Sequence, residues 1–173
     1  MATDKSPLLV LITGLPGAGK TTFARALAKN IGARHFNTDI IRAALGLRGQ
    51  YDEKSKQKVY EELEAQTEQA LMAGERVVVD GTFYRKELRA PYEKLGIQAQ
   101  APVFWLVIEA PPAAIRQRVS EKREYSEADY AVYLKIRAAW EPLDKPHLTL
   151  QSAALEEMVD EALAYLHLLN DSS

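Results

Sequence analysis

The sequence predicts an α/β protein with a five-stranded parallel sheet sandwiched between helices. Strand-like apolar runs alternate with helix-like runs along the chain, which is typical of parallel sheets flanked by helices. A glycine-rich loop joins the first of these strands to the first helix. No linker, low-complexity tract or repeat divides the 173 residues. A single domain over residues 1–173 is therefore expected, with residues 1–7 as a flexible N-terminus.

The first part of the predicted sheet follows from apolar runs and their spacing. Leu8–Thr13 is apolar up to its final residue, as expected for a strand buried on both faces. Apolar residues then recur at helical spacing, at Phe23, Leu27 and Ile31. A short second strand is expected after this helix, at Arg34–Asn37.

A long helix and two further core strands are predicted in the middle of the chain. The helix should cover Asp52–Ala73, because apolar residues form one stripe along it and Gly74 suits a helix end. Arg76–Asp80 and Val103–Ile108 are rich in valine and other β-forming residues, which indicates buried strands.

The last third of the chain is predicted to contain three helices and an edge strand. Prolines at positions 111–112 suit the first turn of a helix. Ser126–Asp129 has the pattern of a capping box, which opens the next helix. The edge strand is expected at His147–Leu150, and an amphipathic helix should follow over Ala153–Leu169.

Composition and charge narrow the classes of protein to which the chain can belong. Its 22 basic residues nearly balance 24 acidic ones, so it lacks the global basic excess of nonspecific nucleic-acid binders. The absence of cysteine excludes disulfides, thiolate metal sites and a thiol nucleophile. The apolar run Leu8–Ile12 is too short for a secretion signal or a membrane span. We therefore expect a soluble, cytoplasmic protein with no membrane partner.

The glycine-rich loop is the strongest functional signal in the sequence. It fits the phosphate-binding pattern G-x-x-x-x-G-K-[ST] at every fixed position. Glycines let successive backbone N–H groups point at phosphate oxygens, and the following helix adds its positive N-terminal end. Lys20 can reach the outer phosphates as a catalytic residue, while the Thr21 hydroxyl can ligate Mg²⁺. The residues expected to bind the nucleotide are Gly14, Leu15, Pro16, Gly17, Ala18, Gly19, Lys20, Thr21 and Thr22.

A carboxylate at the end of a second buried strand fits the same chemistry. Asp80 follows three valines, which is the pattern of the aspartate that assists magnesium binding beside a phosphate loop. Mg²⁺ is therefore predicted to be held by Thr21 and Asp80. This requires the strand that ends at Asp80 to lie beside Leu8–Thr13. The alternative is that Asp80 and Gly81 only form an ordinary turn at the end of the strand.

Another acidic residue lies just beyond the predicted second strand. Because the ends of parallel strands line the ligand crevice, Asp39 should face the nucleotide site. Arg42 is three residues further on, so a helical turn places both side chains on one face. The carboxylate can accept a proton from an attacking hydroxyl, and the guanidinium can hold an anionic group of the acceptor. The alternative is that Asp39 only caps a helix.

Four segments resemble the small phosphotransferases of the P-loop kinase superfamily. They are the phosphate loop, Thr38-Asp39-x-x-Arg42, Val79–Phe83 and the arginines before Ser126. Over residues 9–147 the chain resembles the AAA-type ATP-binding "predicted kinase" group, near polynucleotide kinases, zeta-toxin kinases and chloramphenicol phosphotransferase. This resemblance implies the P-loop kinase fold with a small lid and ATP as phosphoryl donor. It also implies that Asp39 is the general base and that Arg42 binds an anionic group of the substrate.

The resemblance further implies a lid at about residues 116–126. Related kinases carry arginines there that stabilise charge on the transferring phosphoryl group. Arg118 and Arg123 are the catalytic candidates in this chain, and the alternative is a solvated helix face.

An aromatic and basic stretch follows Asp80 and offers a rim for the acceptor. Tyr84 and Arg85 are the residues expected to contact the acceptor there, and Arg89 lies close behind them. The alternative is that these side chains cover a helix surface with their apolar parts. No chemistry is assigned to the three histidines, which lack metal-ligand spacing: His35, His147 and His167.

Three functional hypotheses follow from these patterns. The first is a Mg²⁺-dependent kinase that moves the γ-phosphate of ATP to a hydroxyl of a small molecule. The second is a 5′-hydroxyl polynucleotide kinase, whose partner is a nucleic-acid 5′ end. The third, from another class, is a nucleotide-binding switch or ATPase without phosphotransfer, which has no use for Asp39 or the lid arginines.

Overall fold

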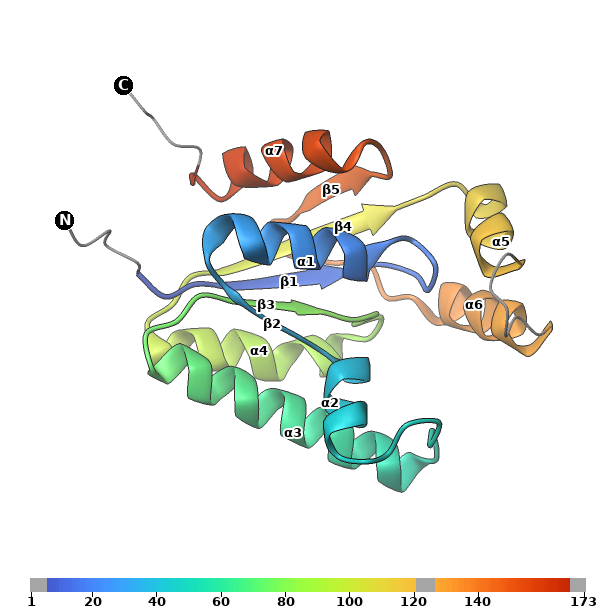
Figure 1. Cartoon of the computed structure of the whole chain (residues 1–173), viewed down its shortest axis with the longest axis horizontal. Coiled ribbons are helices and arrows are strands. Elements are labelled where there is room, and N and C mark those ends of the chain that lie inside the picture. Colours follow the sequence, from blue (N-terminus) through green and yellow to red (C-terminus); the bar gives the residue numbers. More distant parts are fainter. Residues whose placement is uncertain (1–5, 121–126, 169–173) are drawn as a thin grey trace.

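The computed structural model describes residues 6–120 and 127–168, and within them it shows a five-stranded sheet between helices (Figure 1). The strands are β1 (Leu9–Thr13), β2 (Arg34–Asn37), β3 (Val77–Asp80), β4 (Val103–Glu109) and β5 (Leu148–Gln151). The helices are α1 (Lys20–Ile31), α2 (Thr38–Ala44), α3 (Glu53–Met72), α4 (Lys86–Ala99), α5 (Pro112–Ser120), α6 (Glu127–Ala139) and α7 (Leu155–Tyr165). The predicted fold class is confirmed.

The sheet has the order β2-β3-β1-β4-β5, and every pair of neighbouring strands is parallel. Strand β1 is central, and β3 lies directly beside it with Ile12 paired to Asp80. The predicted neighbour relation is therefore confirmed. Because all five strands run the same way, their carboxyl ends meet at one edge of the sheet, where ligands bind in open α/β folds.

Helices cover both faces of the sheet (Figure 1). Val10 and Ile12 of β1 belong to the buried cluster with α1 and α7, while Leu9 and Leu11 belong to the cluster with α3 and α4. This division follows from strand geometry, since successive side chains point to opposite faces. Burial on both sides explains why the β1 sequence is continuously apolar.

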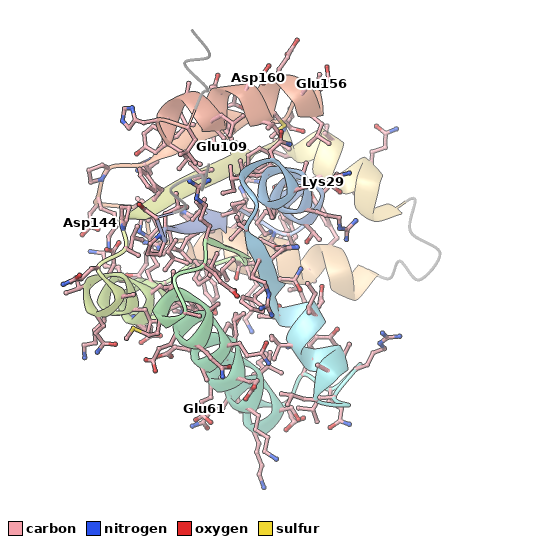
Figure 2. The ribbon with its side chains drawn as sticks, turned by 60° about the vertical axis from the view of Figure 1, so that its left-hand side comes forward. Lys29, Glu61, Glu109, Asp144, Glu156 and Asp160 are labelled. Atoms are coloured by element: carbon pink, nitrogen blue, oxygen red, sulfur yellow. The ribbon has the colours of Figure 1, made fainter. Side chains whose placement is uncertain are left out.

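The outer faces of α3 and α7 carry acidic side chains. Figure 2 shows Glu61 of α3 and Glu156 and Asp160 of α7 on these outer surfaces, and all three side chains are exposed. Across residues 6–120 and 127–168, no helix has the length and apolar character that a membrane span requires.

The predicted bounds match the observed ones closely for helix α3 and less closely for helix α7. Helix α3 begins one residue after Asp52, whose carboxylate caps it by accepting a hydrogen bond from Ser55 N at 3.1 Å. Helix α7 is shorter than the predicted Ala153–Leu169, because His167 adopts a left-handed backbone with φ 58° beyond its last turn. The final residues, 169–173, lie outside the described part of the chain, as do residues 1–5 of the predicted N-terminal tail.

Helices α5 and α6 lie beyond the carboxyl edge of the sheet, at the right of Figure 1. Ile115 of α5 and Tyr133 of α6 form a small buried cluster, and Tyr130 stacks on Tyr133 with ring centroids 5.5 Å apart. The first half of the predicted lid is therefore helix α5. Residues 121–126 of that lid lie outside the described residues.

Candidate active site

The phosphate loop connects the central strand β1 to helix α1, as predicted. Three of its glycines have positive φ angles: Gly14 (157°), Gly17 (82°) and Gly19 (96°). At Gly14 a Cβ atom would lie 2.6 Å from the carbonyl oxygen of Ile108, so only glycine fits there. The loop therefore lies close against the end of β4 before it turns into α1.

Lys20 is the first residue of α1, and its ammonium group folds back over the loop. Its Nζ donates a hydrogen bond to the carbonyl oxygen of Leu15 at 3.0 Å. The side chain is half-buried. The charge therefore lies above the backbone that the sequence predicts to cradle phosphates.

The two predicted metal ligands are brought together. Thr21 Oγ1 donates a hydrogen bond to Asp80 Oδ1 at 3.1 Å, although the residues are 59 positions apart in the sequence. Asp80 is only 4% exposed. A hydroxyl and a buried carboxylate are oxygen donors of the kind that Mg²⁺ prefers, so these residues fit the predicted ion. No cluster of three or more His, Asp or Glu side chains suits a metal anywhere in the described residues.

Two side chains of β2 also reach Asp80, and the sequence analysis gave neither of them a role. His35 Nε2 lies 2.5 Å from Asp80 Oδ2, and Asn37 Nδ2 donates to the same oxygen at 3.2 Å. Strand alternation places positions 35 and 37 on one face, and parallel pairing sets Asn37 opposite Asp80. The alternation of side chains along β2, combined with the pairing of β2 and β3, would have predicted that His35 and Asn37 lie near Asp80.

Asp39 and Arg42 lie on one face of helix α2, as their spacing predicts. Arg42 Nη1 is 3.4 Å from Asp39 Oδ1, and the Asp39 side chain is 81% exposed while that of Arg42 is 7% exposed. The helix cap is Asn37, whose Oδ1 accepts a hydrogen bond from Ile40 N at 2.7 Å. The alternative role of Asp39 as the helix cap is therefore wrong.

The buried guanidinium of Arg42 lies among tyrosines. It stacks on the ring of Tyr51, with Cζ 4.5 Å from the ring centroid. Burial raises the pKa of the nearby Tyr60 phenol, which also lies within electrostatic range of Tyr84 and Arg42. Among the described residues, no group hydrogen-bonds to Arg42 Nε. Tyr60 of helix α3 therefore lies near both predicted acceptor residues, Arg42 and Tyr84, and no pattern in the sequence singles it out.

The sequence model of one protein family, described as "AAA domain", matches residues 9–143. The chain belongs to the AAA domain family. Curated relatives of this AAA domain include an uncharacterized protein of Mycobacterium bovis and one of Mycobacterium tuberculosis. Each is 30% identical over an alignment of 107 residues, and the match covers 55% of this chain. The chain spans 22% of the length of these relatives.

Solved structures with the fold of this AAA domain include three small-molecule kinases. A sugar kinase from Janibacter sp. is 19% identical with a TM-score of 0.69, and the match covers 94% of this chain and 96% of that chain. The APS kinase of Mycobacterium tuberculosis, in complex with AMPPNP and APS, is 19% identical with a TM-score of 0.69. The match covers 94% of this chain and 98% of that chain. A gluconokinase from Sinorhizobium meliloti is 18% identical with a TM-score of 0.67. The match covers 94% of this chain and 93% of that chain. The AAA domain therefore has the P-loop kinase fold, which confirms the resemblance drawn from the sequence.

A cavity of about 460 Å³ adjoins the phosphate loop of the AAA domain. Its walls include Leu15 and Ala18 of the loop, Glu109 of β4, and Tyr133, Arg137 and Trp140 from α6 and its end. Gln151 of β5 also lines it and donates to Glu109 Oε1 at 2.8 Å. Arg137 was missed in the sequence, because a single arginine near a helix end carries no pattern. The side chain of Arg118 and the whole of Arg123 lie outside the described residues.

Tyr84 and Arg85 lie between β3 and α4, with the Arg85 guanidinium 5.0 Å from the centre of the Tyr84 ring. Arg85 Nη1 also pairs with Glu87 Oε1 at 3.4 Å, and half of the Arg85 side chain is exposed. The Arg85 side chain is therefore accessible to solvent, while that of Tyr84 is half-buried.

Arg89 does not lie on the acceptor rim, in contrast to the expectation from sequence. It is only 1% exposed, and its guanidinium lies 5.7 Å from the ring centre of Trp140. It donates hydrogen bonds to the carbonyl groups of Phe83 (2.7 Å from Nε), Pro142 (3.4 Å from Nη1) and Glu141 (from Nη2). Burial lowers the pKa of this guanidinium, while the carboxylates of Glu141 and Asp144 oppose that effect. Arg89 therefore ties the end of α6 to the segment behind β3.

Replacing Arg89 by methionine is expected to lower the free energy of unfolding by about 3 kcal/mol, because buried carbonyl groups lose their donor. Urea denaturation followed by circular dichroism measures this change. Lys94→Met, at an exposed position of the same helix, is the matched control and should shift stability by less than about 0.5 kcal/mol. Equal stability of the two variants would contradict the structural role of Arg89.

Proposed function

We propose that this AAA domain is an ATP-dependent kinase that transfers the γ-phosphate to a hydroxyl of a small-molecule acceptor. The observation that carries the proposal is the hydrogen bond between Thr21 and Asp80 at the phosphate loop, with the exposed Asp39 following the next strand of the sheet. The kinases with the same fold support it, since the APS kinase was solved with the ATP analogue AMPPNP together with APS.

The nucleotide end of the site would be formed by the phosphate loop and the start of α1. Backbone N–H groups within residues 14–22, where Pro16 has none, would hold the phosphates, and the Lys20 ammonium would contact the outer ones. Thr21 and Asp80 would hold Mg²⁺, which neutralises charge on the phosphate oxygens when bound. The cavity beside Leu15 leaves room for ligand next to this loop.

The acceptor end would be formed by α2 and the segment after β3. The acceptor oxygen would attack the γ-phosphorus, the bond to the bridging oxygen of ADP would break, and the hydroxyl proton would pass to Asp39. Arg42, Tyr84 and Arg85 would bind the rest of the acceptor. The Asp39 side chain is 81% exposed, so its carboxylate is open to a hydroxyl that arrives from solvent.

A transfer assay with radiolabelled ATP and a panel of alcohols tests the proposal. The panel should include sugars, nucleosides, antibiotics and 5′-hydroxyl oligonucleotides, and labelled product is expected with a small molecule. Label on oligonucleotides alone would instead favour a polynucleotide kinase. ATP hydrolysis that no alcohol stimulates would favour a nucleotide-dependent switch and overturn the proposal.

We also propose that Arg118 and Arg123 stabilise charge on the transferring phosphoryl group. Arg123→Ala is then expected to lower kcat about 100-fold, with a smaller effect on nucleotide affinity, because the charge to be stabilised develops during transfer. Steady-state kinetics and nucleotide titration together measure the two effects. Lys58→Ala, on the exposed side of α3, is the control for removing a surface charge. A kcat equal to that of the control would leave Arg123 as part of a solvated face.

A further inference from the structure

The carboxylate of Asp80 is held from two sides. Its Oδ1 receives the hydrogen bond from Thr21 of α1, and its Oδ2 is approached by His35 and Asn37 of β2. The His35 side chain is 12% exposed and that of Asp80 is 5% exposed. This group is therefore enclosed by three polar side chains from two other elements.

The chemistry of a carboxylate fixes the direction of these hydrogen bonds. A carboxylate oxygen accepts hydrogen bonds, so His35 Nε2 is assigned as the donor to Asp80 Oδ2. Asn37 Nδ2 is likewise the donor to the same oxygen, at 3.2 Å. With Oδ2 engaged by two donors from β2, Oδ1 is the oxygen that faces the phosphate loop.

Asn37 has a second link, to helix α2. Its Oδ1 accepts a hydrogen bond from Ile40 N at 2.7 Å, while its Nδ2 donates to Asp80. Asn37 itself is buried, with 4% exposed. One amide group thus connects the carboxylate at the end of β3 to the start of the helix that presents Asp39.

We propose that His35 and Asn37 are positioning residues that fix the Asp80 carboxylate for metal binding and set its place relative to Asp39. This inference rests on the proposed function, in which Asp80 helps to hold Mg²⁺. Groups that hydrogen-bond to metal-binding side chains typically change metal affinity 10- to 100-fold when they are lost. The two β2 residues engage Oδ2, and they would therefore keep Oδ1 directed toward Thr21 if Thr21 and Asp80 held Mg²⁺.

Mn²⁺ affinity in the presence of a nonhydrolysable ATP analogue, measured by electron paramagnetic resonance on the whole chain, tests the proposal. His35→Phe keeps an aromatic ring without the donor and is expected to weaken Mn²⁺ binding about tenfold or more. His35→Gln, whose amide can donate to Asp80, is expected to recover most of this loss. Recovery by a donor of another shape separates positioning from packing.

Asn37→Ser separates the two links of Asn37. Serine caps helices well but is too short to reach Asp80, so α2 should stay capped while Mn²⁺ binding weakens about tenfold. Asp52→Ser, the same kind of exchange at the cap of α3, and His147→Phe, at an exposed histidine, are the matched controls. Thermal melting shows which variants are folded.

The outcomes are distinguishable. Weak Mn²⁺ binding by folded His35→Phe and Asn37→Ser, with wild-type values for the controls, supports the positioning role. Wild-type Mn²⁺ affinity in both variants would overturn the role while leaving the kinase proposal intact. Failure of the wild-type protein itself to bind Mn²⁺ with the nucleotide would overturn the kinase proposal, and the positioning role with it. If His35→Phe does not fold, His35→Gln and Asn37→Ser decide, and wild-type affinity in Asn37→Ser overturns the role.

Discussion

Replacing Lys20 by methionine is expected to lower phosphotransfer by at least about 100-fold, which corresponds to roughly 3 kcal/mol of transition-state stabilisation. The Lys20 ammonium lies over the phosphate loop, 3.0 Å from the carbonyl oxygen of Leu15, where the outer phosphates would bind. Methionine keeps the apolar stem and removes the charge. Helix α1 is held in the core by Phe23 and Leu27, so the fold should remain intact. Turnover and circular dichroism measured on the same sample check both parts.

Lys29→Met is the matched control for Lys20→Met. Lys29 lies in the last turn of the same helix, is exposed, and is labelled in Figure 2. Its replacement should leave turnover within a factor of about two, because a surface charge far from the loop is largely screened. Turnover of Lys20→Met within a few fold of wild type would mean that the loop does not act on the transferring phosphate.

Replacing Asp39 by asparagine is expected to lower kcat by about 10²- to 10⁴-fold with little change in ATP affinity. The amide has the shape of the carboxylate but cannot accept the proton of the acceptor hydroxyl. Asn37 and not Asp39 caps α2, and the 3.4 Å pair with Arg42 is largely solvent-exposed on the Asp39 side. Both features indicate that the helix survives the change. Steady-state kinetics with an acceptor and calorimetric titration with ATP measure the two effects.

The matched control for Asp39→Asn is Asp160→Asn. Asp160 is an exposed residue of α7 on the outer surface of the molecule (Figure 2), so neither turnover nor ATP affinity should change. Loss of ATP affinity in Asp39→Asn would place Asp39 in the metal site. The roles assigned to Asp39 and Asp80 would then have to be exchanged.

The core strands of this AAA domain were predictable because each is a continuous apolar run. Helix α4 was not predicted as a range, since Pro91 and Gly96 interrupt its pattern. A proline weakens a helix locally, but Tyr92 and Leu95 pack α4 against the sheet and supply the stability. Packing between distant segments thus formed a helix that local sequence rules disfavour.

The site residues likewise fall into those that local sequence predicts and those that depend on contacts between distant segments. Lys20 and Thr21 belong to a contiguous motif, and Asp80 ends an apolar strand, so each was found from its immediate neighbours in the sequence. The contacts of Asp80 with His35 and Asn37 join residues 45 and 43 positions apart and depend on the pairing of β2 with β3. The burial of Arg89 was not predicted, because it depends on the carbonyl groups of Glu141 and Pro142, which are 52 and 53 positions away in the sequence.

The alternation in β2 has a consequence for how the chain avoids a misaligned sheet during folding. Phe36 enters the core with α3 and α4, while His35 and Asn37 point to the opposite face, toward Asp80. A slip of one residue against β3 would turn the imidazole and the amide into apolar surroundings and expel the phenyl ring. Each unpaired buried polar group costs about 1–3 kcal/mol, so the slipped sheet is strongly disfavoured. Strand β2 has only four residues, and the side chains of His35 and Asn37 that hold Asp80 also favour its correct register against β3.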